Sequence, residues 1–146
     1  MLRNLKTLCF LLPALLFISC DRCMSGRSCA DGFVFKIVDK SSGQDLVFGT
    51  SPVYNLDSVH LFTNLSGYGN GNFLGVQNNT LMSRLTDPID TLFLRLTSTD
   101  TDTLFLSYNY IERECCFFPQ GFGQLRSIKY NKNIVIQEDQ IYVFKK

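Results

Sequence analysis

Two residue types in this 146-residue chain could support catalysis, a single histidine and six cysteines. His60 lies between Val59 and Leu61 in an alternating stretch, so we expect it to face solvent on a strand. A cysteine nucleophile would need that histidine beside it to accept its proton. Because Cys115 and Cys116 are explained more simply as bridged cysteines, we predict that the chain is not an enzyme.

Other sequence motifs for catalysis or cofactor binding are missing. The sequence has no Gly-x-Ser-x-Gly, no paired histidines for a metal and no glycine loop that could cradle a phosphate. We therefore expect no cofactor. A hydrolase that uses carboxylates without a recognisable motif stays open as an alternative.

The stretch from Thr97 to Thr103 alternates aspartates with hydroxyl residues. Aspartate and hydroxyl oxygens are hard ligands, so this stretch could be interpreted as a calcium-binding loop. The twelve-residue calcium loop with its final glutamate is absent, however, and Asp and Thr are ordinary hairpin-turn residues. We favour the turn and predict no metal site.

The start of the chain has the pattern of a secretory signal. Arg3 and Lys6 precede an almost wholly apolar run over residues 7–18. A membrane-spanning helix needs about 20 apolar residues, and this run is shorter and contains Pro13. Without the two leader cations the mature chain is close to neutral, so we expect no nucleic-acid partner.

The apolar run ends in Phe17-Ile18-Ser19-Cys20, which resembles the lipobox of bacterial lipoproteins. The resemblance implies that the Cys20 thiol receives a diacylglycerol, that cleavage occurs before Cys20, and that the new N-terminus is acylated, with palmitate as a typical acyl group. It also implies a cell-envelope location, at the outer membrane and facing the periplasm or the cell surface. The alternative is ordinary signal cleavage, with Cys20 in a disulfide.

Four cysteines remain once Cys9 leaves with the leader and Cys20 takes the lipid. An even number in an exported chain indicates disulfides. Neighbouring cysteines bond directly only with strain, so Cys23 and Cys29 are expected to pair crosswise with Cys115 and Cys116. A zinc site formed by the four cysteines is an alternative, but their spacing in the sequence is unlike that of structural zinc sites. Free thiols are a third possibility.

The rest of the chain predicts one all-β domain. Residues 1–19 are the signal peptide, residues 20–31 the lipidated cysteine and a short tether, and residues 32–146 the domain. Residues 91–97 and 103–111 alternate strictly and predict a hairpin. About seven to nine short strands favour a two-layer β-sandwich, immunoglobulin-like or of a related Greek-key order, over a small barrel.

Three triplets of Asp, then Ser or Thr, then an apolar residue place hydroxyls at Ser58, Thr91 and Thr103. They resemble the O-glycosylation motif of exported Bacteroidota proteins, which implies O-glycans at these hydroxyls. Turn chemistry before a strand produces the same triplets without any modification.

The mature chain also resembles a family of uncharacterised Bacteroidota lipoproteins. The resemblance covers most of the domain from residue 33 onward and implies a compartment but no activity. The residues that carry it are Asp45-Leu46-Val47-Phe48-Gly49 with Pro52 and Tyr54, Glu114-Cys115-Cys116, and Ser127-Ile128-Lys129-Tyr130-Asn131.

Aromatic residues beside glycines suggest where the domain could meet a partner. We expect Tyr68, Phe117, Phe118 and Phe122 to lie in end loops, where rings contact partners or, alternatively, plug the sandwich. The function these features predict is a non-catalytic binding or accessory module for a glycan or an envelope protein. An envelope spacer is the alternative.

The lipid anchor leads to a first prediction. Replacing Cys20 with Ser removes the thiol that accepts the lipid, so the variant should lack acylation and leave the membrane fraction. Mass spectrometry of the mature N-terminus tests this. A wild-type N-terminus at another residue, or an unmodified Cys20, would contradict the assignment.

Overall fold

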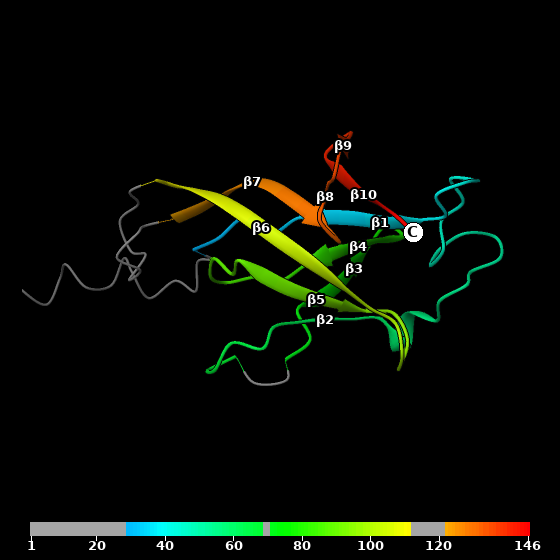
Figure 1. The fold of residues 1–146 in the computed structure, drawn as a ribbon, viewed down its shortest axis with the longest axis horizontal. Helices are drawn as coiled ribbons and strands as arrows, with labels where there is room; N and C mark the ends of the chain where they lie inside the picture. Colours follow the sequence, from blue (N-terminus) through cyan, green and yellow to red (C-terminus); the bar gives the residue numbers. More distant parts are fainter. Residues whose placement is uncertain (1–28, 69–70, 112–121) are drawn as a thin grey trace, which may run out of the picture.

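The structure, a computed structural model, describes residues 29–68, 71–111 and 122–146. The predicted signal peptide, Cys20, Cys23 and the segment with Cys115, Cys116, Phe117 and Phe118 lie outside the described residues. Figure 1 shows the described chain as two layers of strands. Its ten strands are β1 Val34–Val38, β2 His60–Phe62, β3 Leu74–Gln77, β4 Thr80–Ser83, β5 Thr91–Arg95, β6 Thr101–Ile111, β7 Phe122–Tyr130, β8 Asn133–Ile134, β9 Gln137–Glu138 and β10 Ile141–Lys145, with a 3₁₀ turn η2 at Leu56–Ser58.

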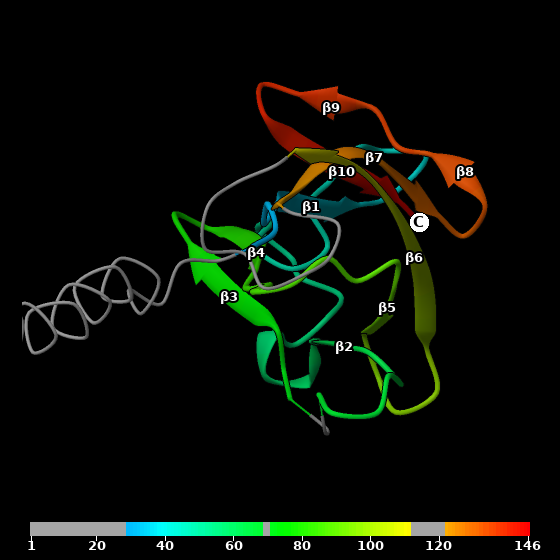
Figure 2. The same cartoon turned by 90° about the vertical axis from the view of Figure 1, so that its left-hand side faces the viewer.

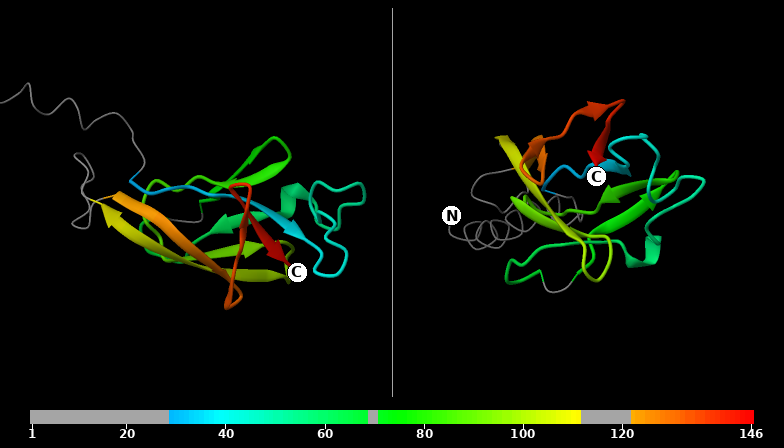
Figure 3. Two further views of the ribbon diagram at one scale, coloured as in Figure 1. Left: turned by 90° about the horizontal axis from the view of Figure 1, so that it is seen from above. Right: turned by 45° about the vertical axis from the view of Figure 1, so that its right-hand side comes forward.

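The strands form two five-stranded sheets. One has the order β3-β4-β1-β10-β9, which we call sheet I, and the other the order β2-β5-β6-β7-β8, which we call sheet II. The left view of Figure 3 shows the two layers facing each other. The prediction of an all-β, two-layer sandwich is therefore confirmed.

The first and last strands lie side by side. β1 pairs with β10 in parallel from Val34 opposite Ile141 to Val38 opposite Lys145, while β4 pairs antiparallel on the other side of β1. A parallel pair cannot be closed by a tight turn, so this contact depends on residues far apart in the sequence. It makes β1 and β10 the middle of sheet I.

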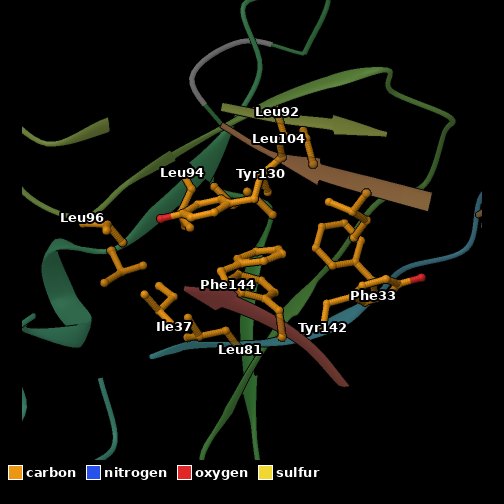
Figure 4. Close-up of a cluster of buried hydrophobic side chains, with 14 of the residues drawn as sticks. Phe33, Ile37, Leu81, Leu92, Leu94, Leu96, Leu104, Tyr130, Tyr142 and Phe144 are labelled. Carbon is orange, nitrogen blue, oxygen red and sulfur yellow. The ribbon is translucent and has the colours of Figure 1, made fainter. Parts of the chain in front are cut away.

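Alternating apolar residues build the core between the sheets. Leu92 and Leu94 of β5 and Leu104 of β6 are fully buried, as the alternation predicts. They belong to the same buried cluster as Phe144, whose ring centroid lies 4.9 Å from that of Tyr130 in a stacked arrangement. Figure 4 shows Tyr130 and Phe144 at the centre of this cluster.

Each pair of sheet edges is closed in its own way. At the β2–β3 edge, the Phe73 N–H donates to Leu61 O (2.7 Å), and Asn72 Oδ1 accepts from the Leu61 N–H (3.0 Å). At the other edge the chain runs from β8 in sheet II to β9 in sheet I, across the top of Figure 2.

Two short strands of sheet I, β4 and β9, were not predicted from the alternation of apolar residues. β4 follows a two-residue turn at Asn78 and Asn79, both with φ near +50° (49° and 55°), the conformation of tight hairpin turns. The hairpin of β5 and β6 is present, but β5 ends at Arg95 and β6 begins at Thr101, so its turn lies two residues earlier in the sequence than expected. Of the tether range, Cys29–Asp31 is described, and it lies against the start of β7 through a bridge between Ala30 and Gly123.

Candidate functional site

The outward side of sheet II carries aromatic and basic side chains. Phe62 on β2 lies opposite Phe93 on β5, and their ring centroids are 5.6 Å apart. On the same strands His60 lies opposite Arg95, and the guanidinium carbon of Arg95 is 5.7 Å from the centre of the Phe62 ring. A guanidinium at this distance is attracted to the ring, so the aromatic pair helps to hold Arg95 in place.

The group continues across the sheet to β6 and β7. Phe105 lies between Thr91 on β5 and Lys129 on β7, and 42% of its surface is exposed. No ring contact of Phe105 occurs within the described part of the chain. We call the set of His60, Phe62, Phe93, Arg95, Phe105 and Lys129 the aromatic-basic face.

The charge of this sheet has one sign on its outer side. Among the residues of its five strands only Asp102 is acidic, and it is buried with 6% of its surface exposed. Arg95, Arg126 and Lys129 are exposed and basic. Charges of a single sign attract ligands of the opposite sign, so the face suits an anionic ligand.

A hollow of about 270 Å³ lies at one end of the face, lined by His60, Phe62, Gly71, Asn72 and Arg95. Asn72 is fixed there because its Oδ1 accepts the N–H groups of Leu61 and Leu74, each at 3.0 Å. Its amide nitrogen is then a donor with a set direction. The hollow offers hydrogen-bond donors and a cation before any ligand arrives.

The acidic turn that could have held calcium contacts a lysine instead. The Nζ of Lys146 lies 2.7 Å from Asp100 Oδ1 and 2.6 Å from Asp102 Oδ2. Tyr130 OH and Asn131 Nδ2 also donate to the Asp102 carboxylate, both at 2.6 Å. These carboxylates are neutralised and hydrogen-bonded by the protein itself, so the structure favours a structural clamp there.

The clamp moves the pKa values of its members. Burial raises the pKa of Asp102, but the hydrogen bonds from Lys146, Tyr130 and Asn131 outweigh it, and the pKa ends below its usual value. Burial and the bond to Asp102 raise the pKa of Tyr130 far above that of a free tyrosine. The cluster is therefore held as a carboxylate, a neutral phenol and an ammonium group at neutral pH.

The three predicted glycosylation positions differ in their surroundings. The single hydroxyl proton of Ser58 lies between two carbonyl acceptors, Asn55 O (2.7 Å) and Leu96 O (2.8 Å), so this hydroxyl serves the fold. Thr91 lies opposite Phe105 and Thr103 lies opposite Phe93, both half-buried on the outer side of sheet II. The two threonines thus lie within the aromatic-basic face.

Of the four aromatic residues predicted to contact a partner, the structure describes Tyr68 and Phe122. Tyr68 is half-buried, its ring 6.0 Å from that of Phe73, and its OH donates to Asp87 Oδ2 (3.1 Å). Phe122 is buried at the start of β7, with 7% of its surface exposed. Of these residues, Phe122 matches the alternative in which the rings plug the sandwich, and Phe117 and Phe118 lie outside the described residues.

Cys29 is the cysteine that the structure describes. It is disulfide-bonded and buried, with 8% of its surface exposed. Its carbonyl accepts the N–H of Gly123 (2.9 Å), and the Asp31 N–H donates to Gly123 O (3.0 Å). The cysteine is thereby fixed beside the start of β7, the strand that follows the Cys115–Cys116 segment in the sequence.

A larger groove, of about 660 Å³, opens beside this junction, with Asp31, Ser83, Gln137, Gln140 and Tyr142 among its lining residues. Two of its polar groups already have backbone partners. Asp31 Oδ2 accepts the N–H of Leu125 (3.2 Å), and Ser83 Oγ accepts the N–H of Phe33 (2.8 Å). These contacts join the N-terminal segment to the sheets, and for that reason we place the candidate site on the aromatic-basic face.

Comparison with known proteins gave no matching family model, no matching curated protein and no matching solved structure. Among the described residues, no three His, Cys, Asp or Glu side chains come together as a metal site would require. The same residues include no helix long and apolar enough to cross a membrane.

The sequence analysis missed most of the aromatic-basic face. The available signal was the outward position of Phe93 and Phe105 within strands whose leucines point inward. In an alternating strand the outward-facing positions are mostly polar. Phenylalanines at such positions on two neighbouring strands indicate a binding surface. Phe62 and Arg95 join the face because β2 pairs with β5, and the alternation of apolar residues alone cannot predict the register of that pair.

The Asp102 clamp predicts a pH-dependent stability. Asp102→Asn should lower the free energy of unfolding at pH 7 by about 2 kcal/mol, because hydrogen bonds to a charged group are lost. The folded pKa of Asp102 lies below the unfolded one, so its contribution is present above about pH 4 and disappears as the pH falls through the folded pKa. Urea unfolding from pH 7 to pH 2 should show the wild-type and variant curves converging. Glu138→Gln, at an exposed strand residue, is the control, and a gap that is constant with pH would contradict the clamp.

Proposed function

We propose that the protein is an exported, lipid-anchored, non-catalytic binding module of the cell envelope. The observation that carries the proposal is a disulfide at Cys29 together with a preformed aromatic-basic face on one side of the domain. Disulfides persist in oxidising compartments, which supports export. The exposed ring of Phe105 and the half-buried rings of Phe62 and Phe93, beside cations on a sheet, support binding.

The groups that could act as catalysts have other roles. His60 lies opposite Arg95 on the sheet surface, with neither a thiol nor a metal-ligand cluster beside it among the described residues. Asp100 and Asp102 are held by Lys146. A general base or nucleophile must be free to reach substrate, which these carboxylates are not. The same contacts weaken the alternative of a carboxylate hydrolase.

The proposed anchor keeps the domain close to the membrane. Cys20 lies nine residues before Cys29, and an extended chain of that length reaches about 30 Å. Because Cys29 is fixed against β7, the tether ends where the domain begins. A ligand of this module would therefore be bound near the membrane, in the outer-membrane location that we propose. A pure spacer would have no need of exposed rings and a hollow, so we favour binding over the spacer.

We also propose that the fold is a Greek-key sandwich related to the immunoglobulin-like group and that the chain belongs with the Bacteroidota lipoproteins it resembles. The strand order supports the first point. β2 and β5 are neighbours although the β3–β4 hairpin between them lies in the other sheet, and β10 returns beside β1. Chain crossings between the two sheets also occur in immunoglobulin-like sandwiches, where they form Greek-key connections.

A retention experiment tests binding without catalysis. Full-length wild-type protein is immobilised through its C-terminus and incubated with an extract of its own envelope. Bound material is then eluted by competition with the same protein free in solution. We expect a component that is specifically displaced and chemically unchanged when mass spectrometry compares it before and after contact. Turnover of that component would contradict the non-catalytic role, and no displaceable component at all would contradict the binding role.

A further inference from the structure

The geometry points to an acidic polysaccharide, a chain of sugars that carry carboxylates, as the ligand of the aromatic-basic face. This inference rests on the proposed binding function and names its ligand class. It is carried by three features of sheet II: an anion-binding hollow, a platform of rings and hydroxyls, and a second cation beyond the platform.

The hollow at one end fits a carboxylated sugar. Arg95 offers a planar guanidinium, which binds carboxylates through two parallel hydrogen bonds, and the Phe62 ring holds it in position. Asn72 adds an amide donor whose direction is fixed by its two accepted N–H groups. At about 270 Å³ the hollow is smaller than the sites of drug-sized ligands, so it suits a single sugar unit.

The middle of the face alternates rings with hydroxyls. Thr91 lies opposite Phe105, and Phe93 lies opposite Thr103, so the four side chains form a checkerboard on two neighbouring strands. The C–H groups on one side of a sugar ring pack against an aromatic ring, and threonine hydroxyls both donate to and accept from sugar hydroxyls. This arrangement suits a ligand that is apolar on one face and polar at its rim.

A second cation continues the track. Lys129 lies directly opposite Phe105 on β7, on the far side of the platform from Arg95. The strands of sheet II place no exposed carboxylate between the two cations, since Asp102 is their single acidic residue and it is buried. Two cations separated by a ring platform match a chain in which charged sugars repeat.

The surface fits a protein partner less well. The core of a protein interface is a continuous apolar patch, whereas here polar Thr91 and Thr103 alternate with Phe93 and Phe105 on β5 and β6. A simple acidic polypeptide such as polyglutamate has no flat apolar face to lie on a ring, so the cations alone would hold it. The contribution of Phe105 therefore distinguishes the two classes of ligand.

Affinity electrophoresis of the full-length protein in detergent tests the inference, with polygalacturonate as the acidic polysaccharide and dextran as the neutral one. Wild-type protein should be retarded by polygalacturonate and not by dextran. Arg95→Gln should weaken retardation at least tenfold, and Phe105→Ala about fivefold. The matched controls, Lys145→Gln on sheet I and Ile136→Ala at another exposed apolar residue, should bind as wild type. Thermal melting of each variant verifies that the fold is kept.

The outcomes separate this inference from the proposed function. Equal effects of Arg95→Gln and Lys145→Gln, or no retardation of wild type, would overturn it. Equal retention by polyglutamate, unaffected by Phe105→Ala, would also overturn it and point to an acidic protein. If the protein retains a displaceable envelope component but not polygalacturonate, the ligand class is wrong while the binding function stands. If neither is retained, the proposed function fails as well.

Discussion

The stack of Tyr130 on Phe144 is the contact on which the rest of the fold depends. One ring comes from sheet II and the other from sheet I, and their planes are nearly parallel, 5° apart. Phe144 also packs against Phe35, 4.9 Å away, so a single residue of β10 joins β1 to the opposite sheet. The Asp102 clamp lies beside the stack, because the Tyr130 hydroxyl donates to that carboxylate. Apolar burial and a satisfied polar network thus fix the two layers at the same place.

The contacts around the Tyr130–Phe144 stack use the inner side of sheet II, so its outer side takes no part in the core. Leu92, Leu94 and Leu104 fill the interior, and their neighbours in the sequence point outward by the pleat of the strand. Those outward neighbours include Phe93 and Phe105, whose rings carry part of the proposed recognition. A rigid sheet holds such rings at a constant spacing, so little ordering cost is expected on binding.

Alternation predicted the strands that bury one face, and it failed where pairing decides the structure. The leucines of β5 and β6 repeat every second residue, and the structure confirms both strands. β4 buries only Leu81 and Ser83, too short a pattern to stand out, although the two asparagines before it are a turn signal. The aromatic-basic face could not be assembled from the sequence, because it joins strands whose register is set by non-local contacts. The location of Cys29 beside β7 also depends on non-local contacts and could not be predicted from the sequence.

The junction of Cys29 with β7 links the fold to the proposed compartment, since Cys29 is disulfide-bonded and its carbonyl accepts the N–H of Gly123. The most direct test is a peptide map of the protein without reduction, isolated from its own envelope with thiols blocked at lysis. The account predicts that the peptide with Cys29 is linked to the peptide that contains Cys115 and Cys116. A freely alkylated Cys29 in that material would contradict both the cross-linked fold and the exported location.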